Sequence, residues 1–97
     1  MSRKTTPTRD RWWYLTEPLS TVVKTHRALM YTPRTMTADE PMGWIEPREE
    51  YWLPVIVNPA LSVLERECVF RGLLAAEFGV DTTNWPVPMD LSGKGDR

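Results

Sequence analysis

Hydrophobic and polar positions follow a helical period most clearly in the second half of the chain. Asn58 and Pro59 provide an N-cap followed by proline at the first helical position, and Gly79 provides a stop signal. The pattern between them predicts one helix over residues 59–78, about 30 Å long at 1.5 Å per residue. A second start signal, Ser62 with Glu65 three residues later, fits a capping box and would begin the helix about one turn later.

This predicted helix is apolar on two nearly opposite sides. One uncharged stripe consists of Leu61, Leu64, Cys68, Gly72 and Ala75, and the other consists of Val63, Phe70 and Leu74. A helix with two apolar sides has to be covered on both. We expect the cover to come either from the rest of this short chain or from another protein.

Three shorter segments carry the pattern of strands or extended chain. Residues 51–57 are rich in aromatic and β-branched side chains and form the best predicted strand. Pro54 lies inside that strand and has no amide hydrogen, so we expect an edge strand, a bulge or merely extended chain. The aromatic run at residues 12–15 also predicts a strand or extended segment, and residues 44–46 form a further short one.

Residues 17–31 carry a mixed pattern. Apolar residues occur close to the spacing of one helical face, and Thr16 is a candidate N-cap, so a helix is the favoured prediction. The β-branched residues in 21–25 favour a strand over residues 21–31 as the alternative. Taken together, the elements predict the α+β class, with one long helix packed on short extended segments.

The two ends of the chain differ in composition from its middle. Residues 1–10 hold no apolar residue after Met1 and predict a flexible basic arm. Residues 11–79 predict a single small domain, and residues 80–97 predict a tail that contains proline and glycine. Trp85 in that tail either lies across the long helix or contacts a partner.

Length and composition exclude several classes of protein. A chain of 97 residues can hold one small domain, and its single cysteine, Cys68, excludes an intramolecular disulfide. The chain lacks an apolar run of the ~18 residues that a membrane span needs, and its start lacks the apolar stretch of a signal peptide. We therefore expect a protein that is neither secreted nor bound to a membrane, located in the cytoplasm or within a virion.

Charge is distributed unevenly although the net charge is −1. Residues 1–38 carry seven Lys and Arg against two acids, a balance of +5, and residues 39–97 carry five against eleven acids, a balance of −6. Such asymmetry is typical of a basic arm that binds an anion, of two complementary halves, or of head-to-tail association between copies.

The sequence contains few residues that are candidates for a catalytic, metal or phosphate-binding site. His26 is the one histidine, but no nucleophile motif accompanies it, so a packing or surface histidine is the favoured interpretation. Cys68 lies on an uncharged helical stripe and is interpreted as a buried apolar residue. The acids of residues 39–50 lack the spacing of a metal site, and Gly93-Lys94-Gly95 lacks the context of a phosphate loop. The sequence therefore predicts no catalytic residue, metal or cofactor.

Five tryptophans in so short a chain favour a non-enzymatic interaction or structural accessory protein, completed by a protein partner or a second copy, for example as a phage or virion component. The predicted contact residues are Trp12, Trp13, Trp44, Trp52, Val63, Phe70, Leu74 and Trp85. The alternative is a nucleic-acid-associated regulator that uses the arm residues Arg3, Lys4, Arg9 and Arg11. A third class is an inhibitor that binds a host protein, and a small enzyme using His26 or Cys68 ranks below these.

Overall fold

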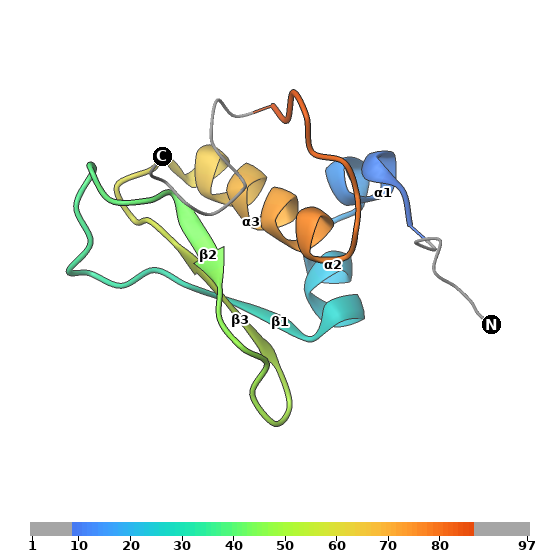
Figure 1. Cartoon of the computed structure of the whole chain (residues 1–97), viewed down its shortest axis with the longest axis horizontal. Helices are drawn as coiled ribbons and strands as arrows, with labels where there is room; N and C mark the ends of the chain where they lie inside the picture. The colour runs from blue at the N-terminus through green and yellow to red at the C-terminus, as the bar shows by residue number, and fades with distance from the viewer. Residues whose placement is uncertain (1–8, 87–97) are drawn as a thin grey trace.

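The computed structural model describes residues 9–86, shown as a coloured ribbon in Figure 1. In chain order, the elements of this part are α1 (Arg11–Thr16), α2 (Leu19–His26), β1 (Ala28–Tyr31), β2 (Gly43–Ile45), β3 (Leu53–Val57) and α3 (Val63–Glu77). The predicted α+β class is confirmed, with the long helix packed on strands. Most of the predicted arm (residues 1–10) and most of the predicted tail (residues 80–97) lie outside the described residues.

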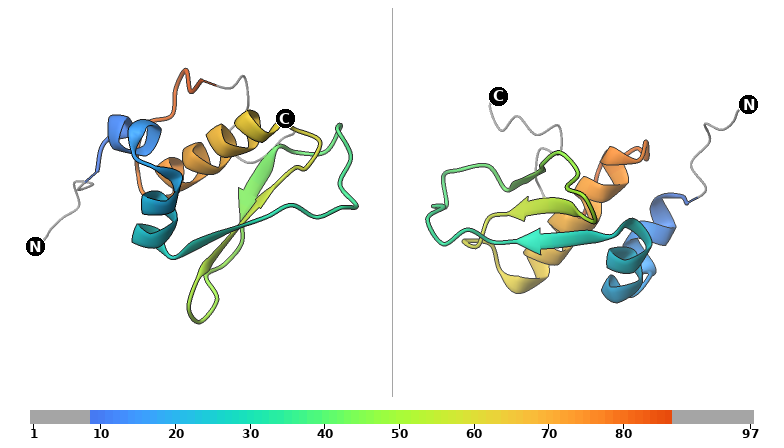
Figure 2. Two further views of the ribbon diagram at one scale, coloured as in Figure 1. Left: turned by 180° about the vertical axis from the view of Figure 1, so that it is seen from behind. Right: turned by 90° about the horizontal axis from the view of Figure 1, so that it is seen from below.

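The three strands form one mixed sheet with the order β1-β3-β2. β1 runs parallel to β3 with Ala28 opposite Leu53, and β2 runs antiparallel to β3 with Gly43 opposite Val57. α3 lies across one face of this sheet, α1 packs against α3, and α2 contacts both α3 and β1 (Figures 1 and 2). The last strand in sequence is therefore the central one.

The second half of α3 is the centre of the core. Every residue from Val69 to Ala75 is buried, because the sheet covers one side of the helix and α1, α2 and residues 80–86 cover the others. The two apolar sides predicted for this helix are thus both covered by the chain itself. The first turn differs, since Val63 and Leu64 are largely exposed.

The observed helix α3 begins later than the main prediction and ends where predicted. Ser62 is its N-cap, and the reciprocal bonds between Ser62 and Glu65 form the capping box that was the alternative start. Asn58 instead pins the preceding loop, since its side-chain amide donates to the carbonyls of Thr37, Glu40 and Pro41. At the other end Gly79 adopts φ +88°, and Val80 N–H donates to Ala75 O at 2.8 Å in a Schellman motif.

The aromatic run at residues 12–15 is helical, so the predicted strand is wrong. Asp10 caps α1 by accepting a bond from Trp13 N–H, and this local cap outweighs the strand preference of the aromatic residues. The buried Arg71 stabilises the end of α1, where its guanidinium donates to the carbonyls of Tyr14 and Glu17. Glu67 accepts two bonds from the same guanidinium and balances its charge.

Residues 17–31 contain both a helix and a strand, so the predicted helix and the alternative strand are each correct for part of this range. Helix α2 ends at His26, and Arg27 adopts the left-handed conformation, with φ 52° and ψ 47°, before strand β1 begins. The periodic apolar spacing thus identified the helix, whereas the strand alternative was correct for its last four residues. One left-handed residue separates the two elements without a loop.

Pro54 lies in the central strand, so the expectation of an edge strand or a bulge is wrong. Its carbonyl accepts a bond from Glu46 N–H at 3.0 Å, which places its backbone polar side toward the end of β2. A residue in a strand directs N–H and C=O to the same neighbour. Pro54 therefore lies opposite Glu46, one residue beyond the last pair of the β2–β3 ladder, Ile45 with Val55. The ladder ends before it would need an amide hydrogen from Pro54.

The packed region extends past the predicted boundary at residue 79. Trp85 is 6 % exposed, and its indole N–H donates to the carbonyl of Cys68 on α3 at 2.9 Å. Arg11 holds the same segment from α1 through bonds to the carbonyls of Asp81 and Asn84. Residues 80–86 therefore belong to the domain, with Trp85 as part of its core.

Candidate functional site

One face of the sheet carries apolar side chains that no helix of the described chain covers. Side chains alternate across a strand, so the residues that face α3 are Ala28, Met30, Gly43, Ile45, Leu53, Val55 and Val57. The opposite face carries Leu29, Tyr31, Trp44, Pro54 and Ile56, with Trp52 just before β3 in the same alternation. These six residues are called the open sheet face below; the right-hand view of Figure 2 looks onto the strands from this side.

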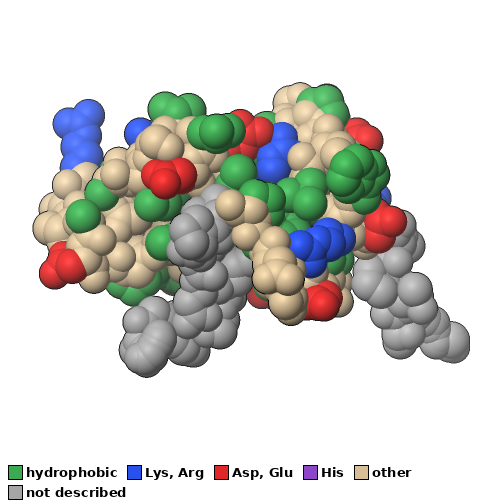
Figure 3. All heavy atoms as spheres, turned by 90° about the horizontal axis from the view of Figure 1, so that it is seen from above, with side chains coloured by type: hydrophobic (Ala, Val, Ile, Leu, Met, Phe, Trp, Pro, Cys, Tyr) green, Lys and Arg blue, Asp and Glu red, His purple; other side chains and the backbone are tan. Residues whose placement is uncertain are grey.

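The open sheet face is only partly accessible at its centre and more accessible along β1. Leu29 and Tyr31 are 41 % and 40 % exposed, and Trp52 is 36 % exposed. Pro54 is buried among them and Ile56 is half-buried, so the accessible aromatic rings stand around a shielded apolar floor. On the side of the helices, by contrast, apolar side chains occur in several groups with charged side chains between them (Figure 3).

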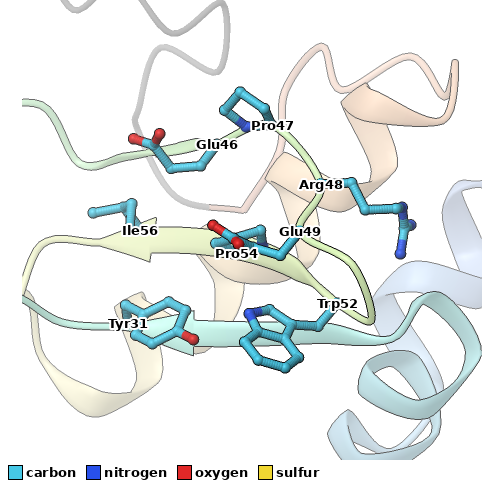
Figure 4. A pocket seen from close by; sticks show the side chains of 8 residues that line it. All are labelled: Tyr31, Glu46, Pro47, Arg48, Glu49, Trp52, Pro54 and Ile56. Carbon is cyan, nitrogen blue, oxygen red and sulfur yellow. The ribbon is translucent and has the colours of Figure 1, made fainter.

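A hollow of about 630 Å³ lies on this face. Its floor is formed by Tyr31 on β1 and by Pro54 and Ile56 on β3, and the Trp52 ring lies over β1 beside Tyr31 (Figure 4). The β2–β3 connection supplies the remaining wall with Glu46, Pro47, Arg48 and Glu49. This volume lies within the range of sites that hold a ligand or a partner side chain.

Hydrogen bonds made by residues of the β2–β3 connection fix the wall of the hollow. Glu49 N–H donates to the carbonyl of Trp52 at 2.8 Å, which closes the turn. The indole N–H of Trp44 donates to the carboxylate of Glu46 and fixes that side chain at the edge of β2. The hollow is therefore formed by paired strands and a hydrogen-bonded turn, and its shape is largely preformed.

The charges around the hollow are mainly negative. Glu46 and Glu49 line it, and the Glu49 carboxylate makes no hydrogen bond or ion pair with another residue of the described range 9–86. Arg48 also lines the hollow, but its guanidinium points away and donates to the carbonyl of His26 at 3.3 Å (Figure 4). Two carboxylates thus stand over an apolar floor without a cation directed into the hollow from residues 9–86.

The structure divides the predicted contact residues into three groups. Trp44 and Trp52 lie on the same face of the sheet, but Trp44 is opposite Ile56 near one end of β3 and only Trp52 lines the hollow. Trp12 and Val63 are exposed at 69 % and 73 % on α1 and on the first turn of α3, and Trp13 is half-buried beside Tyr14. Phe70, Leu74 and Trp85 are buried inside the chain. The last three are core residues and are not available to a partner, contrary to the sequence-based assignment.

Sequence reasoning missed four residues of the open sheet face: Leu29, Tyr31, Pro54 and Ile56. A signal was present, because these residues sit at every second position of the two strands. The favoured helix over residues 17–31 concealed the alternation on β1. The proline concealed the central position of β3.

The basic-arm residues are only partly described. Arg3 and Lys4 lie outside the described range. The Arg9 guanidinium lies 5.1 Å from the centre of the Trp13 ring, and Arg11 stacks 5.5 Å from the centre of the Trp85 ring while bonding to segment 80–86. Arg11 therefore serves the fold, which leaves a smaller cluster for nucleic acid than the sequence indicated.

His26 packs among aromatic rings. Its Nε2 shares a 2.9 Å hydrogen bond with the Tyr14 hydroxyl, and the ring stacks on Tyr14 and on Phe78 with ring centres 5.5 and 4.3 Å away. Burial, with a further contribution from Arg9 and Arg48, lowers the pKa of His26 from 6.5 to about 4. The neutral ring is thus a packing group at neutral pH, as the favoured interpretation of the sequence held.

The remaining candidate groups lack the features of a reactive site. Burial and the nearby Glu67 carboxylate raise the pKa of the Cys68 thiol, which favours the unreactive protonated form. Thr37 donates to the carboxylate of Asp39 and lowers its pKa, so this acid is bound into a turn of the loop. Residues 9–86 contain no cluster of three or more His, Cys, Asp or Glu side chains placed to bind a metal ion.

Comparisons with family models, with curated proteins and with solved structures gave no match for this chain. None of the described helices combines the length and apolar character required to cross a membrane. Function therefore has to be inferred from the geometry of the open sheet face.

Proposed function

We propose that this chain is a non-enzymatic interaction protein, an accessory or structural component of a larger assembly that binds a protein partner through the open sheet face. The observation that carries the proposal is the set of aromatic and apolar side chains on a sheet face that the helices leave uncovered. Tyr and Trp are the residues most enriched at the energetic centre of protein interfaces, because each combines a large apolar area with a polar group.

The composition of this face suits an interface better than it suits free solvent. Burying accessible apolar surface contributes about 25 cal/mol per Å², and clustered exposed apolar side chains commonly mark interaction sites. A partner that covers Leu29, Tyr31 and Trp52 would remove partly exposed side chains from water. Strand pairing already fixes the backbone of Leu29 and Tyr31, so binding does not have to order that backbone.

The size of the face limits the kind of interface. A four-residue strand is about 13 Å long and three strands span about 10 Å between the outer axes. A stable interface buries about 800 Å² on each partner. The open sheet face would therefore form the apolar centre of a contact, with the β2–β3 connection and neighbouring loops as its rim.

The test begins with a library of random peptides displayed on phage, selected on the purified full-length chain. Enriched peptides are synthesised, and their affinities are measured for the wild type, for Trp52→Ser and for Trp12→Ser. Both substitutions replace a partly or largely exposed tryptophan, but only Trp52 belongs to the open sheet face. We expect Trp52→Ser to weaken binding at least about tenfold, as for a hot-spot residue, and Trp12→Ser to change it less than about twofold.

Circular dichroism of each variant serves as the control that the fold is retained. Equal affinity of the enriched peptides for wild type and Trp52→Ser would contradict the proposal. A selection that enriches nothing above the starting library would contradict it as well. The class of inhibitor that binds a host protein would use the same surface and gives the same results in this assay.

A further inference from the structure

We infer that the hollow on the open sheet face receives a cationic side chain, arginine or lysine, from an apolar segment of the partner protein. The inference rests on the proposed function and adds the chemistry of the partner. Three features carry it: the aromatic rings beside the hollow, the carboxylates on its wall, and the direction of the one arginine that lines it.

The aromatic rings provide a surface for a cation and for its alkyl stem. Tyr31 and Trp52 stand on the same side of β1, and each is exposed by more than a third. The faces of such rings attract guanidinium and ammonium groups, with tryptophan as the best partner. Long basic side chains also pack their methylene groups on apolar surface while the charge stays near water, which suits the shielded floor of Pro54 and Ile56.

The carboxylates select the sign of the charge. Glu49 has no hydrogen-bond or ion-pair partner among residues 9–86, and Glu46 is bonded through one of its two oxygens to the Trp44 indole. Each can accept a bond from an entering guanidinium, and charge-assisted bonds of this kind are among the stronger ones. An anionic partner group would instead be repelled by both carboxylates.

Arg48 does not neutralise the hollow. Its guanidinium is turned toward the carbonyl of His26, which lies on the helical side of the β2–β3 connection. A second copy of this chain docking face to face would add its own Glu46 and Glu49 to the same interface. The charges therefore favour binding of a basic segment of a partner protein over symmetric pairing of two open sheet faces.

The test uses acetylated and amidated hexapeptides that alternate leucine with arginine, and a matched series in which citrulline replaces arginine. Citrulline keeps the shape of the side chain and removes its charge. Nitrogen-15-labelled full-length protein is titrated with each peptide to about 10 mM, a range that detects millimolar affinity. We expect the arginine peptide to shift the Trp52 indole signal and to bind at least about fivefold more tightly than the citrulline peptide.

Glu49→Gln and Glu50→Gln form a matched pair of variants. Both remove one carboxylate from the same connection, but Glu49 lines the hollow and Glu50 does not. We expect Glu49→Gln to weaken the arginine peptide about two- to fivefold, the range of an exposed ion pair, and Glu50→Gln to have a smaller effect. Added salt should reduce the difference between the two variants.

The outcomes separate this inference from the proposed function. Equal binding of both peptides with a Trp52 shift would overturn the cationic pocket and leave protein binding at this face intact. A lack of any Trp52 shift with the arginine peptide would also overturn the cationic pocket. If the displayed peptides then proved independent of Trp52 as well, the proposed function would fail separately.

Discussion

At the scale of single residues, the packing of the three helices depends on the charge of His26, because this side chain contacts all three. The residue ends α2, bonds to Tyr14 of α1 and stacks on Phe78 at the end of α3. The neutral imidazole fits this site, whereas an imidazolium would be held between apolar rings and near the guanidinium groups of Arg9 and Arg48. Protonation of His26 should therefore oppose folding.

The pKa of His26 gives a testable pH dependence of stability. Its value of about 4 in the folded state lies below the 6.5 of the free side chain, so the unfolded state binds the proton more readily. The stabilisation is complete above pH 6.5 and is lost as pH falls toward 4. A shift of this size corresponds to about 3 kcal/mol, of which about half should be lost by roughly pH 5.3.

Urea unfolding at several pH values between 7 and 5 measures this effect before most carboxylates titrate. His26→Gln is the control, since glutamine keeps a polar group near Tyr14 and has no proton to bind in this range. Its stability should be lower at pH 7 and should vary less with pH. An imidazole that titrates at about 6.5 in the folded wild type, observed by NMR, would contradict the prediction.

At the scale of secondary structure, β2 and α3 approach each other through Gly43. A Cβ atom at this position would lie 2.4 Å from the carbonyl oxygen of Ile56 and 3.0 Å from Cδ1 of Leu73. The first contact is with the backbone of the central strand, which cannot rotate away. Gly43→Ala should therefore shift β2 and destabilise the fold by about 1–3 kcal/mol, the range of an overpacked core.

Gly79→Asn is the comparison for this variant. Gly79 has a positive φ, but a Cβ atom added there would meet open space, and asparagine is one of the residues that tolerate this conformation. Chemical denaturation should show a loss of less than about 1 kcal/mol for Gly79→Asn. A Gly43→Ala variant as stable as Gly79→Asn would show that the contacts of β2 with β3 and α3 adapt easily.

The same elements show which parts of the fold the sequence could predict. The long helix and its Gly79 stop followed from local signals, because caps and apolar period act within a few residues. The helical state of Trp12 and Trp13 was missed although its Asp10 cap is a local signal; the bonds from Arg71 that also stabilise it come from far away in the sequence. Pairing of Pro54 in a central strand likewise depends on where β2 ends.

The candidate site was predicted in part for the same reason. Trp44 and Trp52 were identified by residue type alone, but residue type could not separate exposed tryptophans from the buried Trp85. Tyr31 joins the site only through the parallel pairing of β1 with β3, a contact between distant segments. Local sequence patterns carry little information on such pairings.

At the scale of the whole molecule, the covered helix α3 argues for a chain whose core does not require a partner. From Val69 to Ala75, its two apolar sides meet the sheet on one side and α1, α2 and residues 80–86 on the others. The bonds from Arg11 and Trp85 hold the last of these segments in place. The Trp85 side chain is thus a long-range contact on which closure of the core depends.

Trp85→Ala should consequently destabilise the whole domain. Removing a buried tryptophan typically costs about 3–5 kcal/mol, which is a large share of the roughly 5–15 kcal/mol that stabilises a domain. The matched substitution is Trp12→Ala, because that indole is 69 % exposed and its removal should cost less than about 1 kcal/mol. Circular dichroism during urea unfolding compares both variants with the wild type without relying on tryptophan emission. Similar midpoints for the two variants would mean that residues 80–86 can leave α3 without opening the core. The surface of α3 under Trp85 would then be a further apolar surface to consider for a partner.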